Sequence, residues 1–260
     1  MTNAAQQWRD ELAAWAIDPE ILARAPQSPW EMPPEAFPAD DRKPSDTPSR
    51  QRALDALPAG GSALDVGCGA GAAGLALAPP AALLVGVDQS ARMLDAFSRA
   101  AQDRGVAHEA IEGRWPDIEG RAPLVDVVVA HNVAYNVADL PAFAHALSWH
   151  ARHRVVLELT HTHPLTFQGP LWQHFHGQAR PKGPSAELAR DVLAEAGLPV
   201  RMERFAAPAR SLDPALRARL TRIRLCLPAD REPEVAELLS AAGPAPSRNL
   251  VTLWLDTPRG

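Results

Sequence analysis

Residues 64–71 read Leu-Asp-Val-Gly-Cys-Gly-Ala-Gly, and residues 86–90 read Gly-Val-Asp-Gln-Ser. An apolar stretch leads into each segment, so the pattern predicts two buried strands, the first ending in a glycine turn that opens a helix. The glycines permit a tight turn and let a ligand approach bare backbone. Asp88, at the carboxyl end of the second strand, can accept hydrogen bonds from both hydroxyls of a ribose. Together, the two segments indicate a site for a nucleoside-containing cofactor rather than an ordinary turn.

The spacing of the glycines distinguishes between cofactors. The dinucleotide-binding fingerprint is G-x-G-x-x-G, and Gly67, Gly69 and Ala72 fit its looser form. Here, however, Asp65 precedes the turn and Gly71 follows two residues after Gly69. This D-x-G-x-G-x-G arrangement resembles motif I of the class I S-adenosylmethionine (SAM) dependent methyltransferases.

The resemblance implies a role for each part of this region. In that family the strand-end acid and the glycine backbone hold the amino acid part of SAM, which would be the role of Asp65, and the acid that ends the second strand, here Asp88, binds the ribose. Residues 111–115, Ile-Glu-Gly-Arg-Trp, stand where the third strand ends beside the adenine, and residues 125–131 resemble the fourth strand. The cofactor-binding residues implied in this way are Asp65, Gly67, Cys68, Gly69, Gly71, Asp88, Gln89, Met93, Glu112, Gly113, Arg114, Trp115 and His131.

Some of these residues have a second interpretation. Trp115 either stacks near the adenine or belongs to the core or its rim. Glu112 can accept a hydrogen bond from the adenine amino group, although Gly113 and Arg114 stand where the family usually has its acid. Cys68 is expected to be a small packing residue rather than a nucleophile, because no activating base is evident beside it.

Length and composition describe one large domain with an N-terminal appendage. The chain has 260 residues, 46% of them hydrophobic, which is enough to bury a sizeable core. The net charge of −5 makes nucleic acid an unexpected partner and favours a small molecule. Two cysteines, Cys68 and Cys226, indicate reduced thiols and a cytoplasmic location. No signal-peptide pattern and no run of ~18 apolar residues is present, so we expect a soluble protein without a membrane partner.

Apolar runs alternate with helical patterns along the chain. This order predicts an α/β fold: a Rossmann-like, doubly wound, mostly parallel seven-stranded sheet in a three-layer α/β/α sandwich, with the ligand at the carboxyl ends of the strands. The resemblance, which covers roughly residues 48–205 and a strand near 250–255, implies that the last strand is antiparallel. The predicted strands are 62–66, 83–88, 107–112, 124–130, 153–160, 198–205 and 250–255, and the predicted helices are 4–16, 49–57, 70–77, 91–104, 139–150, 186–196, 212–224 and 232–241. The predicted domains are residues 1–47, a helix followed by a proline-rich lid segment, and residues 48–260, a SAM-binding domain with a loop inserted at 162–183.

The residues after the fourth strand are where the family builds its acceptor site. They read His-Asn-Val-Ala-Tyr-Asn over residues 131–136. His131 is the candidate general base, because an imidazole with a free pKa of about 6.5 can take a proton at neutral pH. Tyr135 and Asn136 are candidates for orienting the acceptor. The alternative is that His131 hydrogen-bonds a neighbouring loop and that Tyr135 packs against the cofactor.

Histidines are concentrated between residues 161 and 176, as His161-Thr-His163 and His174-Phe-His176. On extended chain each pair would place both rings on one face and could bind a metal ion, but no cysteine or carboxylate completes a familiar ligand pattern, so we predict no metal. We interpret the segment as a loop that covers the acceptor pocket. A satellite hydrophobic cluster under the edge of the sheet is the alternative. The predicted substrate-binding residues are Trp30, His161, Trp172, His174 and Phe175.

The sequence therefore predicts a SAM-dependent methyltransferase that transfers a methyl group directly to an oxygen or nitrogen of a small molecule and releases S-adenosylhomocysteine (SAH). A SAM-binding module without catalysis, acting as a sensor or partner subunit, is one alternative. An RNA methyltransferase is another, and it would need a local basic groove. An NAD-dependent oxidoreductase is disfavoured by the glycine spacing. We expect a monomer or a homodimer.

Overall fold

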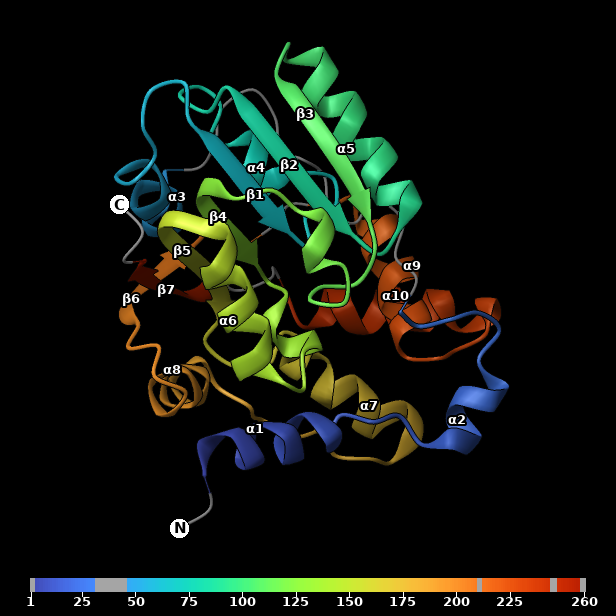
Figure 1. Cartoon of the computed structure of the whole chain (residues 1–260). Helices are drawn as coiled ribbons and strands as arrows, with labels where there is room; N and C mark the ends of the chain where they lie inside the picture. Colours follow the sequence, from blue (N-terminus) through green and yellow to red (C-terminus); the bar gives the residue numbers. More distant parts are fainter. Residues whose placement is uncertain (1–2, 31–45, 210–211, 244–246, 258–260) are drawn as a thin grey trace.

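The computed structural model describes residues 3–30, 46–209, 212–243 and 247–257. Its centre is a seven-stranded sheet of order β3-β2-β1-β4-β5-β7-β6 (Figure 1). Strands β1 to β5 pair in parallel, and β7 runs antiparallel to both β5 and β6. The strands are β1 (Ser62–Val66), β2 (Leu83–Asp88), β3 (Ala107–Glu112), β4 (Val125–His131), β5 (Ala151–Thr160), β6 (Arg201–Ala207) and β7 (Arg248–Asp256). The predicted Rossmann-like sheet with one antiparallel strand is confirmed.

Helices cover both faces of the sheet, because side chains alternate between the faces along each strand. On one face, Leu64 and Val66 of β1 join a hydrophobic cluster with three helices, α1, α6 and α8. On the other face, Ala63 joins a cluster with α3, α4 and α5. The bounds are α1 (Ala4–Ala13), α3 (Pro48–Leu54), α4 (Ala72–Leu75), α5 (Ala91–Asp103), α6 (Leu140–His150) and α8 (Ala186–Glu195). The three-layer sandwich is therefore as predicted.

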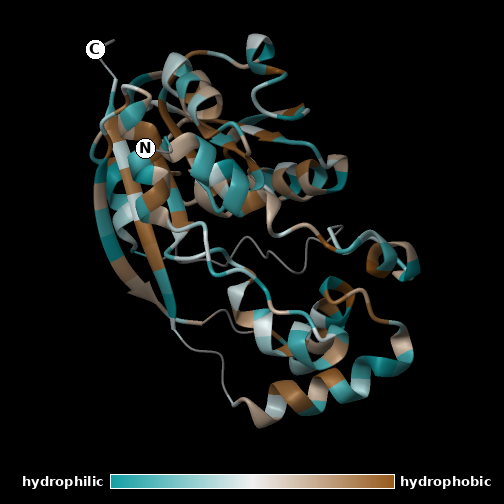
Figure 2. Ribbon diagram, turned by 90° about the horizontal axis from the view of Figure 1, so that it is seen from below, coloured by the Kyte–Doolittle hydropathy of each residue, from teal (hydrophilic) through white to brown (hydrophobic). Residues whose placement is uncertain are grey.

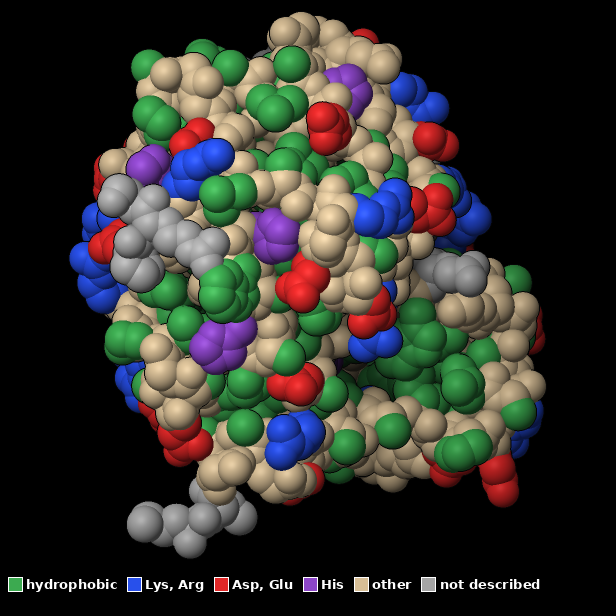
Figure 3. All heavy atoms as spheres, viewed as in Figure 1, with side chains coloured by type: hydrophobic (Ala, Val, Ile, Leu, Met, Phe, Trp, Pro, Cys, Tyr) green, Lys and Arg blue, Asp and Glu red, His purple; other side chains and the backbone are tan. Residues whose placement is uncertain are grey.

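Four further helices form a separate cluster that we call the helical unit. They are α2 (Pro19–Arg24), α7 (Gly169–His176), α9 (Pro214–Arg224) and α10 (Glu232–Ala241). Trp172, Leu225 and Val235 lie at the centre of this cluster. Because α7 follows β5 and α9 follows β6, the unit lies at the carboxyl edge of the parallel strands. Figure 2 shows two helices standing apart from the strands, and Figure 3 shows a hollow between the sheet-containing body and the lower right of the molecule.

The inserted segment 162–183 is not the loop that we predicted. It contains a short 3₁₀ turn, η4 (Thr166–Gln168), and then α7. Pro170 lies in the first turn of α7, where its missing N–H costs nothing, and Gly177 ends the helix with a φ of +66°. The other short 3₁₀ turns are η2 (Glu119–Arg121), η3 (Ala134–Asn136) and η5 (Ala229–Arg231).

The N-terminal region also differs in part from the prediction. The predicted helix 4–16 ends at Ala13, and α2 begins six residues later because Asp18 accepts a hydrogen bond from the Glu20 N–H and Pro19 starts the helix. The α1 backbone is tied to α8, since the Ala4 N–H donates to the Glu195 carboxylate at 2.8 Å. Most of the predicted proline-rich lid, residues 31–45, lies outside the described residues. The division at residue 47 stays a prediction.

Gly86 in β2 offers a test of the packing between the sheet and α5. A Cβ atom at Gly86 would lie 2.7 Å from Phe97 Cε1 and 3.0 Å from Cys68 Sγ. We expect Gly86→Ala to lower the free energy of unfolding by about 1–3 kcal/mol through overpacking, as measured by chemical denaturation. Gly120→Ala is the matched control, because a Cβ atom there would meet nothing within 4 Å. Equal stability of the two variants would contradict this account of the core.

Candidate active site

The glycine turn and the strand-end acids lie together at the carboxyl edge of the sheet. Asp65, in β1, is buried, and its Oδ2 accepts a hydrogen bond of 2.7 Å from the Gly74 N–H in α4. Its Oδ1 is buried without a hydrogen-bond partner among the described residues. Burial raises the pKa of Asp65 to about 6, although His131 and the Gly74 bond oppose the shift. A buried acceptor without a donor fits a cationic group such as the ammonium of an amino acid.

Three N–H groups of the glycine turn are already used within the protein. Gly67 and Cys68 both donate to the carbonyl oxygen of Val87, at 2.8 and 3.0 Å. Gly69 donates to Asp88 Oδ2 at 2.9 Å. A pyrophosphate needs free N–H donors, so this turn does not fit the phosphates of a dinucleotide at these positions. The space above Gly69 is open, because a Cβ atom there would meet nothing within 4 Å, and a ligand can therefore lie against the backbone.

Asp88 organises the neighbouring strand ends. Its Oδ2 bonds to Gly69, and its Oδ1 accepts from the Ser90 N–H at 2.9 Å. Each carboxylate oxygen has a second lone pair, so both remain able to accept a ribose hydroxyl. Asp88 pairs in register with Glu112, and the Gly113 N–H donates to the Asp88 carbonyl at 3.0 Å. The structure thus brings together the predicted ribose acid and the predicted adenine segment.

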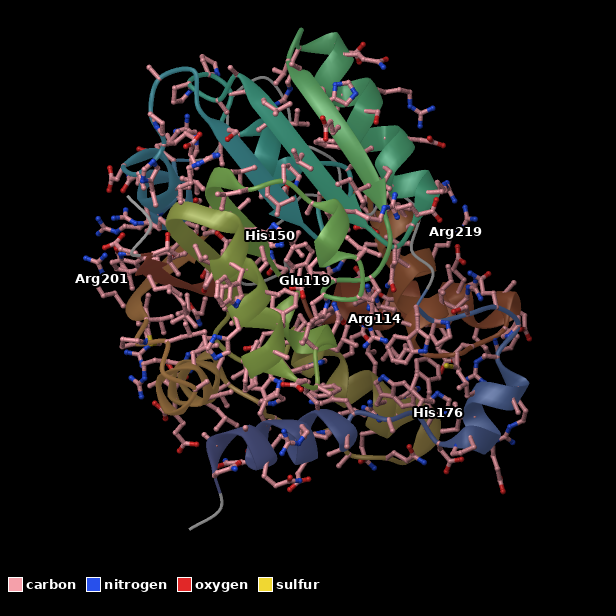
Figure 4. The ribbon with its side chains drawn as sticks, viewed as in Figure 1. Arg114, Glu119, His150, His176, Arg201 and Arg219 are labelled. Carbon is pink, nitrogen blue, oxygen red and sulfur yellow. The ribbon has the colours of Figure 1, made fainter. Side chains whose placement is uncertain are left out.

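Other predicted cofactor residues differ in their exposure. Trp115 is buried in the cluster under α6, with its ring edge-on to that of His150 at 5.1 Å, which is the core position left open as an alternative. In Figure 4, Arg114 extends from the loop after β3 toward the lower half of the molecule. Cys68 is buried and its thiol pKa is raised by burial, which agrees with a packing role. Of the remaining predicted residues, Met93 is buried, whereas Gln89, Glu112 and Arg114 are exposed.

His131 lies at the end of β4, opposite Glu158 of β5 in the strand register. Its Nδ1 is 3.9 Å from Glu158 Oε2, and its Nε2 is buried without a hydrogen-bond partner among the described residues. Glu158 itself is only 7% exposed. The next residue, Asn132, has a φ of +60° and donates its N–H to the Glu158 carbonyl at 2.7 Å. A non-glycine residue in this region of φ is uncommon and marks a backbone that its surroundings hold in place.

Our sequence analysis missed Glu158. The signal was present, because the carboxylate interrupts the apolar run Val155-Val156-Leu157-Glu158-Leu159. A charged residue within a buried strand needs a partner or a ligand. Only the register between β4 and β5, however, shows that the facing residue is His131.

Tyr135 and Asn136 lie in the loop after β4 but in different surroundings. The Tyr135 hydroxyl donates to the Thr160 carbonyl at 2.6 Å, and its ring stacks on Trp8 of α1 at 5.6 Å. Burial raises the pKa of this hydroxyl. Asn136 is exposed. Tyr135 therefore ties α1 to the sheet, and the predicted roles of both residues in orienting an acceptor stay predictions.

The predicted substrate residues from the inserted segment contact other parts of the protein. His174 Nε2 lies 2.9 Å from Glu234 Oε1 of α10, and the Phe175 ring lies under Arg231 at 5.1 Å. Trp172 is buried in the helical unit. These contacts match the satellite cluster that we left open as an alternative.

The remaining predicted residues of this group are dispersed. His161 Nδ1 lies 3.2 Å from Glu187 Oε1 of α8, and Trp30 lies near Trp172 in the wall of a small pocket. His174 and His176 both belong to α7, so they do not meet the condition of extended chain under which the pair could bind a metal ion, and Figure 4 shows His176 low on the helical unit. Within the described ranges, no group of three or more His, Cys, Asp or Glu residues could hold a metal ion.

A larger pocket, of about 370 Å³, lies away from these residues. It is lined by residues that include Leu57, His153 and Asp256. His153 is near the start of β5 and Asp256 ends the antiparallel β7, so this pocket lies at the edge of the sheet opposite Asp65. It takes no part in the candidate site.

Residues 63–153 match the family model described as "Methyltransferase domain". A comparison with curated proteins finds no match. Among solved structures, the YcgJ protein of Bacillus subtilis is similar with 16% identity and a TM-score of 0.54, covering 82% of this chain and 99% of that one. A putative methyltransferase of Bacillus halodurans C-125 has 14% identity and a TM-score of 0.54, covering 81% and 97%.

The fold of these proteins is not limited to one reaction. The [4+2]-cyclase SpnF is similar with 16% identity and a TM-score of 0.51, covering 81% of this chain and 80% of that one. At such identities the likeness establishes the fold, whereas the reaction has to be argued from the site.

The raised pKa of Asp65 gives a prediction for cofactor binding. Only the ionised carboxylate attracts an ammonium, so SAH affinity should fall as the pH drops below about 6, by up to tenfold per pH unit. The sign for stability is opposite: because the folded pKa lies above the unfolded value, the contribution of this group to stability declines as the pH rises from about 4 to about 6. Titration calorimetry with SAH between pH 5 and 8 measures the affinity.

Two variants control this experiment. Asp65→Asn should bind SAH weakly at every pH and lose the dependence below pH 6. Asp103→Asn, at an exposed position of α5, should behave like the unmodified protein. The same pH dependence in Asp65→Asn would remove Asp65 from the cofactor site.

Asp88 gives a second prediction. Asp88→Ala should weaken SAH binding by about tenfold to more than a hundredfold, because each charge-assisted hydrogen bond contributes ~1.5–3 kcal/mol. Asp95→Ala, an exposed acid of α5, is the control and should leave the affinity unchanged. Circular dichroism checks that Asp88→Ala keeps its fold, since Asp88 also holds Gly69. An unchanged SAH affinity in folded Asp88→Ala would exclude the ribose role.

Proposed function

We propose that this chain, which carries a class I SAM-dependent methyltransferase domain, transfers the methyl group to an oxygen or nitrogen atom of a small molecule. The domain assignment rests on the match of residues 63–153 and on the strand order. SAM, the predicted cofactor, is the methyl donor of this family, and SAH is the product. The observation that carries the proposal is the position of two buried atoms without a partner among the described residues, Asp65 Oδ1 and His131 Nε2, on the adjacent strands β1 and β4.

The protein would hold the cofactor by its strand ends. Asp65 would bind the ammonium of SAM, the open backbone at Gly69 would lie against its amino acid part, and Asp88 would bind the ribose hydroxyls. Methyl transfer from a sulfonium is an in-line displacement, so alignment of the acceptor and exclusion of water provide much of the rate.

His131 is the residue that we assign to proton transfer. Its Nε2 would accept the proton that the acceptor oxygen or nitrogen loses as the methyl group arrives. Glu158 faces the other ring nitrogen at 3.9 Å and would stabilise the imidazolium that forms. The Asn132 N–H donates to the Glu158 carbonyl at 2.7 Å, which holds the end of β4 beside β5.

The arginines favour a small-molecule acceptor over RNA. Three arginines of the segment 201–224 that could form a basic groove face acids instead: Arg201 contacts Asp256, Arg204 contacts Glu187 and Arg222 contacts Glu232. Paired charges of this kind offer little attraction to phosphates. A cytoplasmic location and a monomer or homodimer are part of the proposal. No described helix is long and apolar enough to cross a membrane.

A screen for SAH formation tests the proposal directly. The purified protein is incubated with SAM and with small molecules that carry hydroxyl or amino groups, and SAH release is measured. SAH release with at least one compound would support the proposal that the protein is a methyltransferase. SAH binding in calorimetry without turnover on any class of acceptor would favour the SAM-binding module without catalysis.

With an acceptor in hand, His131→Ala tests the base. We expect SAH affinity to change by less than about threefold, while kcat falls by about 10²–10⁴, the usual contribution of general base catalysis. His145→Ala, at an exposed position of α6, is the matched control and should keep full activity. An unaltered kcat in His131→Ala across the pH range would reject the base role.

A further inference from the structure

Arg224, the last residue of α9, is a partly buried cation that no described residue neutralises. It makes no hydrogen bond or ion pair with another described residue, and burial alone lowers its pKa. Arg222, two residues earlier, is also buried, but its Nε lies 3.1 Å from Glu232 Oε2 and its Nη1 donates to the Leu227 carbonyl at 2.7 Å. Of these two arginines on α9, Arg222 thus has an acid and a carbonyl as partners, whereas Arg224 has neither among the described residues. A desolvated guanidinium is costly unless an anion or an acceptor meets it.

Arg180 brings a second guanidinium to the same place. It lies between two tryptophan rings, 5.0 Å from the centre of Trp15 and 4.7 Å from that of Trp172. Two of its nitrogens donate to the carbonyls of Trp15 and Ala16 after the end of α1. Its Nε is buried without a hydrogen-bond partner among the described residues. The aromatic rings fix this guanidinium, and its buried Nε–H stays available as a donor.

Both arginines line one small pocket, which we call the arginine pocket. Trp15, Trp30 and Trp172 form much of its wall, and none of its lining residues is acidic. Its free volume is about 10 Å³, which is room for about one water molecule. A larger group would enter only if a wall moves, and the Trp30 side chain, 57% exposed, is the wall residue most open to solvent.

The arginine pocket is connected to the candidate active site by a row of rings. Trp15 stacks on His163 at 3.8 Å, and His163 lies edge-on to Tyr135 at 5.3 Å. Tyr135 belongs to the loop that begins with His131. Burial and the two arginines lower the pKa of His163 to about 4, so this ring is uncharged at neutral pH. A continuous row of aromatic rings therefore connects the loop after β4 with the pocket that Arg224 lines.

We propose that the arginine pocket binds a carboxylate carried by the methyl acceptor, with Arg224 as its principal anchor and the exposed Trp30 ring against an apolar, planar part of the same molecule. A guanidinium offers two parallel N–H donors, which match the two oxygens of a carboxylate. Trp30, which is 57% exposed, provides flat apolar surface beside it, whereas the Trp15 and Trp172 rings are covered by Arg180. The identification of the ligand as the acceptor rests on the proposed function, whereas the anion site itself does not.

The test uses three small probes that share a phenyl ring. Benzoate carries the carboxylate, benzamide is its uncharged counterpart, and phenyl phosphate carries a different anion. Tryptophan fluorescence and the melting temperature are followed during titration of the full chain, because three tryptophans line the pocket. We expect saturable binding of benzoate with a Kd of about 10 mM or lower, and at least about tenfold weaker binding of benzamide and of phenyl phosphate.

Variants on α9 locate the effect. Arg224→Gln should weaken benzoate at least about tenfold and leave benzamide unaffected. Arg219→Gln is the matched control, an exposed arginine of the same helix labelled in Figure 4, and should bind benzoate normally. Arg224→Lys, which keeps the charge without the fork, should be intermediate, and it serves as the test if Arg224→Gln does not fold.

The outcomes separate this inference from the proposed function. Absence of saturable benzoate binding, equal binding of benzoate and benzamide, or equal benzoate affinity in Arg224→Gln and Arg219→Gln overturns the arginine pocket. Tighter binding of phenyl phosphate overturns the carboxylate assignment. SAH is titrated in parallel and should bind equally to all the variants. Benzoate binding without SAH binding would overturn the methyltransferase proposal and leave the anion site in place.

Discussion

The buried carboxylate of Asp65 is the constraint on which the site depends. It joins the end of β1 to the first turn of α4 through the Gly74 N–H, and it does so in a space where a Cβ on Gly74 would lie only 3.1 Å from Oδ2. One oxygen is satisfied by this bond and the other is not. A half-satisfied buried acid is costly to the free protein, as the raised pKa shows, and a cationic ligand removes that cost. The internal bonds of the glycine turn agree with a cationic ligand, because the N–H groups of Gly67, Cys68 and Gly69 already have acceptors within the protein and do not offer themselves to an anion.

The cofactor end of the site could be predicted from the sequence because it is built from local features. The strands β1 and β2 are continuous buried apolar runs, and their ends are marked by glycines and acids within a few residues. Glu158 could not be assigned in this way. Its partner is 27 positions away in the sequence, and only the pairing of β4 with β5 brings it opposite His131. Sequence periodicity gives the face of a strand, but it does not give the register between strands.

Two helices of the helical unit, α2 and α7, were missed for a different reason, whereas α9 and α10 were predicted. Pro19 and Pro170 each lie in the first turn of a missed helix, a position where the missing N–H is harmless. Both helices are short, and their stability comes from packing of Ile21 and Trp172 against α9 and α10. These contacts join segments that lie far apart in the chain. The same limit explains why the arginine-rich segment 201–224 gave no functional prediction. Arg222 and Arg224 look alike in sequence, and only the packed structure shows that Arg222 pairs with Glu232 while no described residue pairs with Arg224.

These differences describe a division within the molecule. The strand ends that would bind SAM belong to the sheet, where Asp65 and Asp88 are held by hydrogen bonds from the turns and the helix that follow β1 and β2. The helical unit follows β5 and β6 and takes part of its core from the N-terminal segment, so its shape depends on pieces that the sheet does not specify. In an open α/β sheet the ligand lies beyond the carboxyl ends of the strands, between these two parts. A change in the helical unit can therefore alter the acceptor that fits while the residues around Asp65 and Asp88 stay the same. The cofactor could therefore be predicted from the sequence, because the residues that would bind it stand at the ends of strands. The acceptor could not be predicted, because the shape of its pocket depends on how distant helices pack.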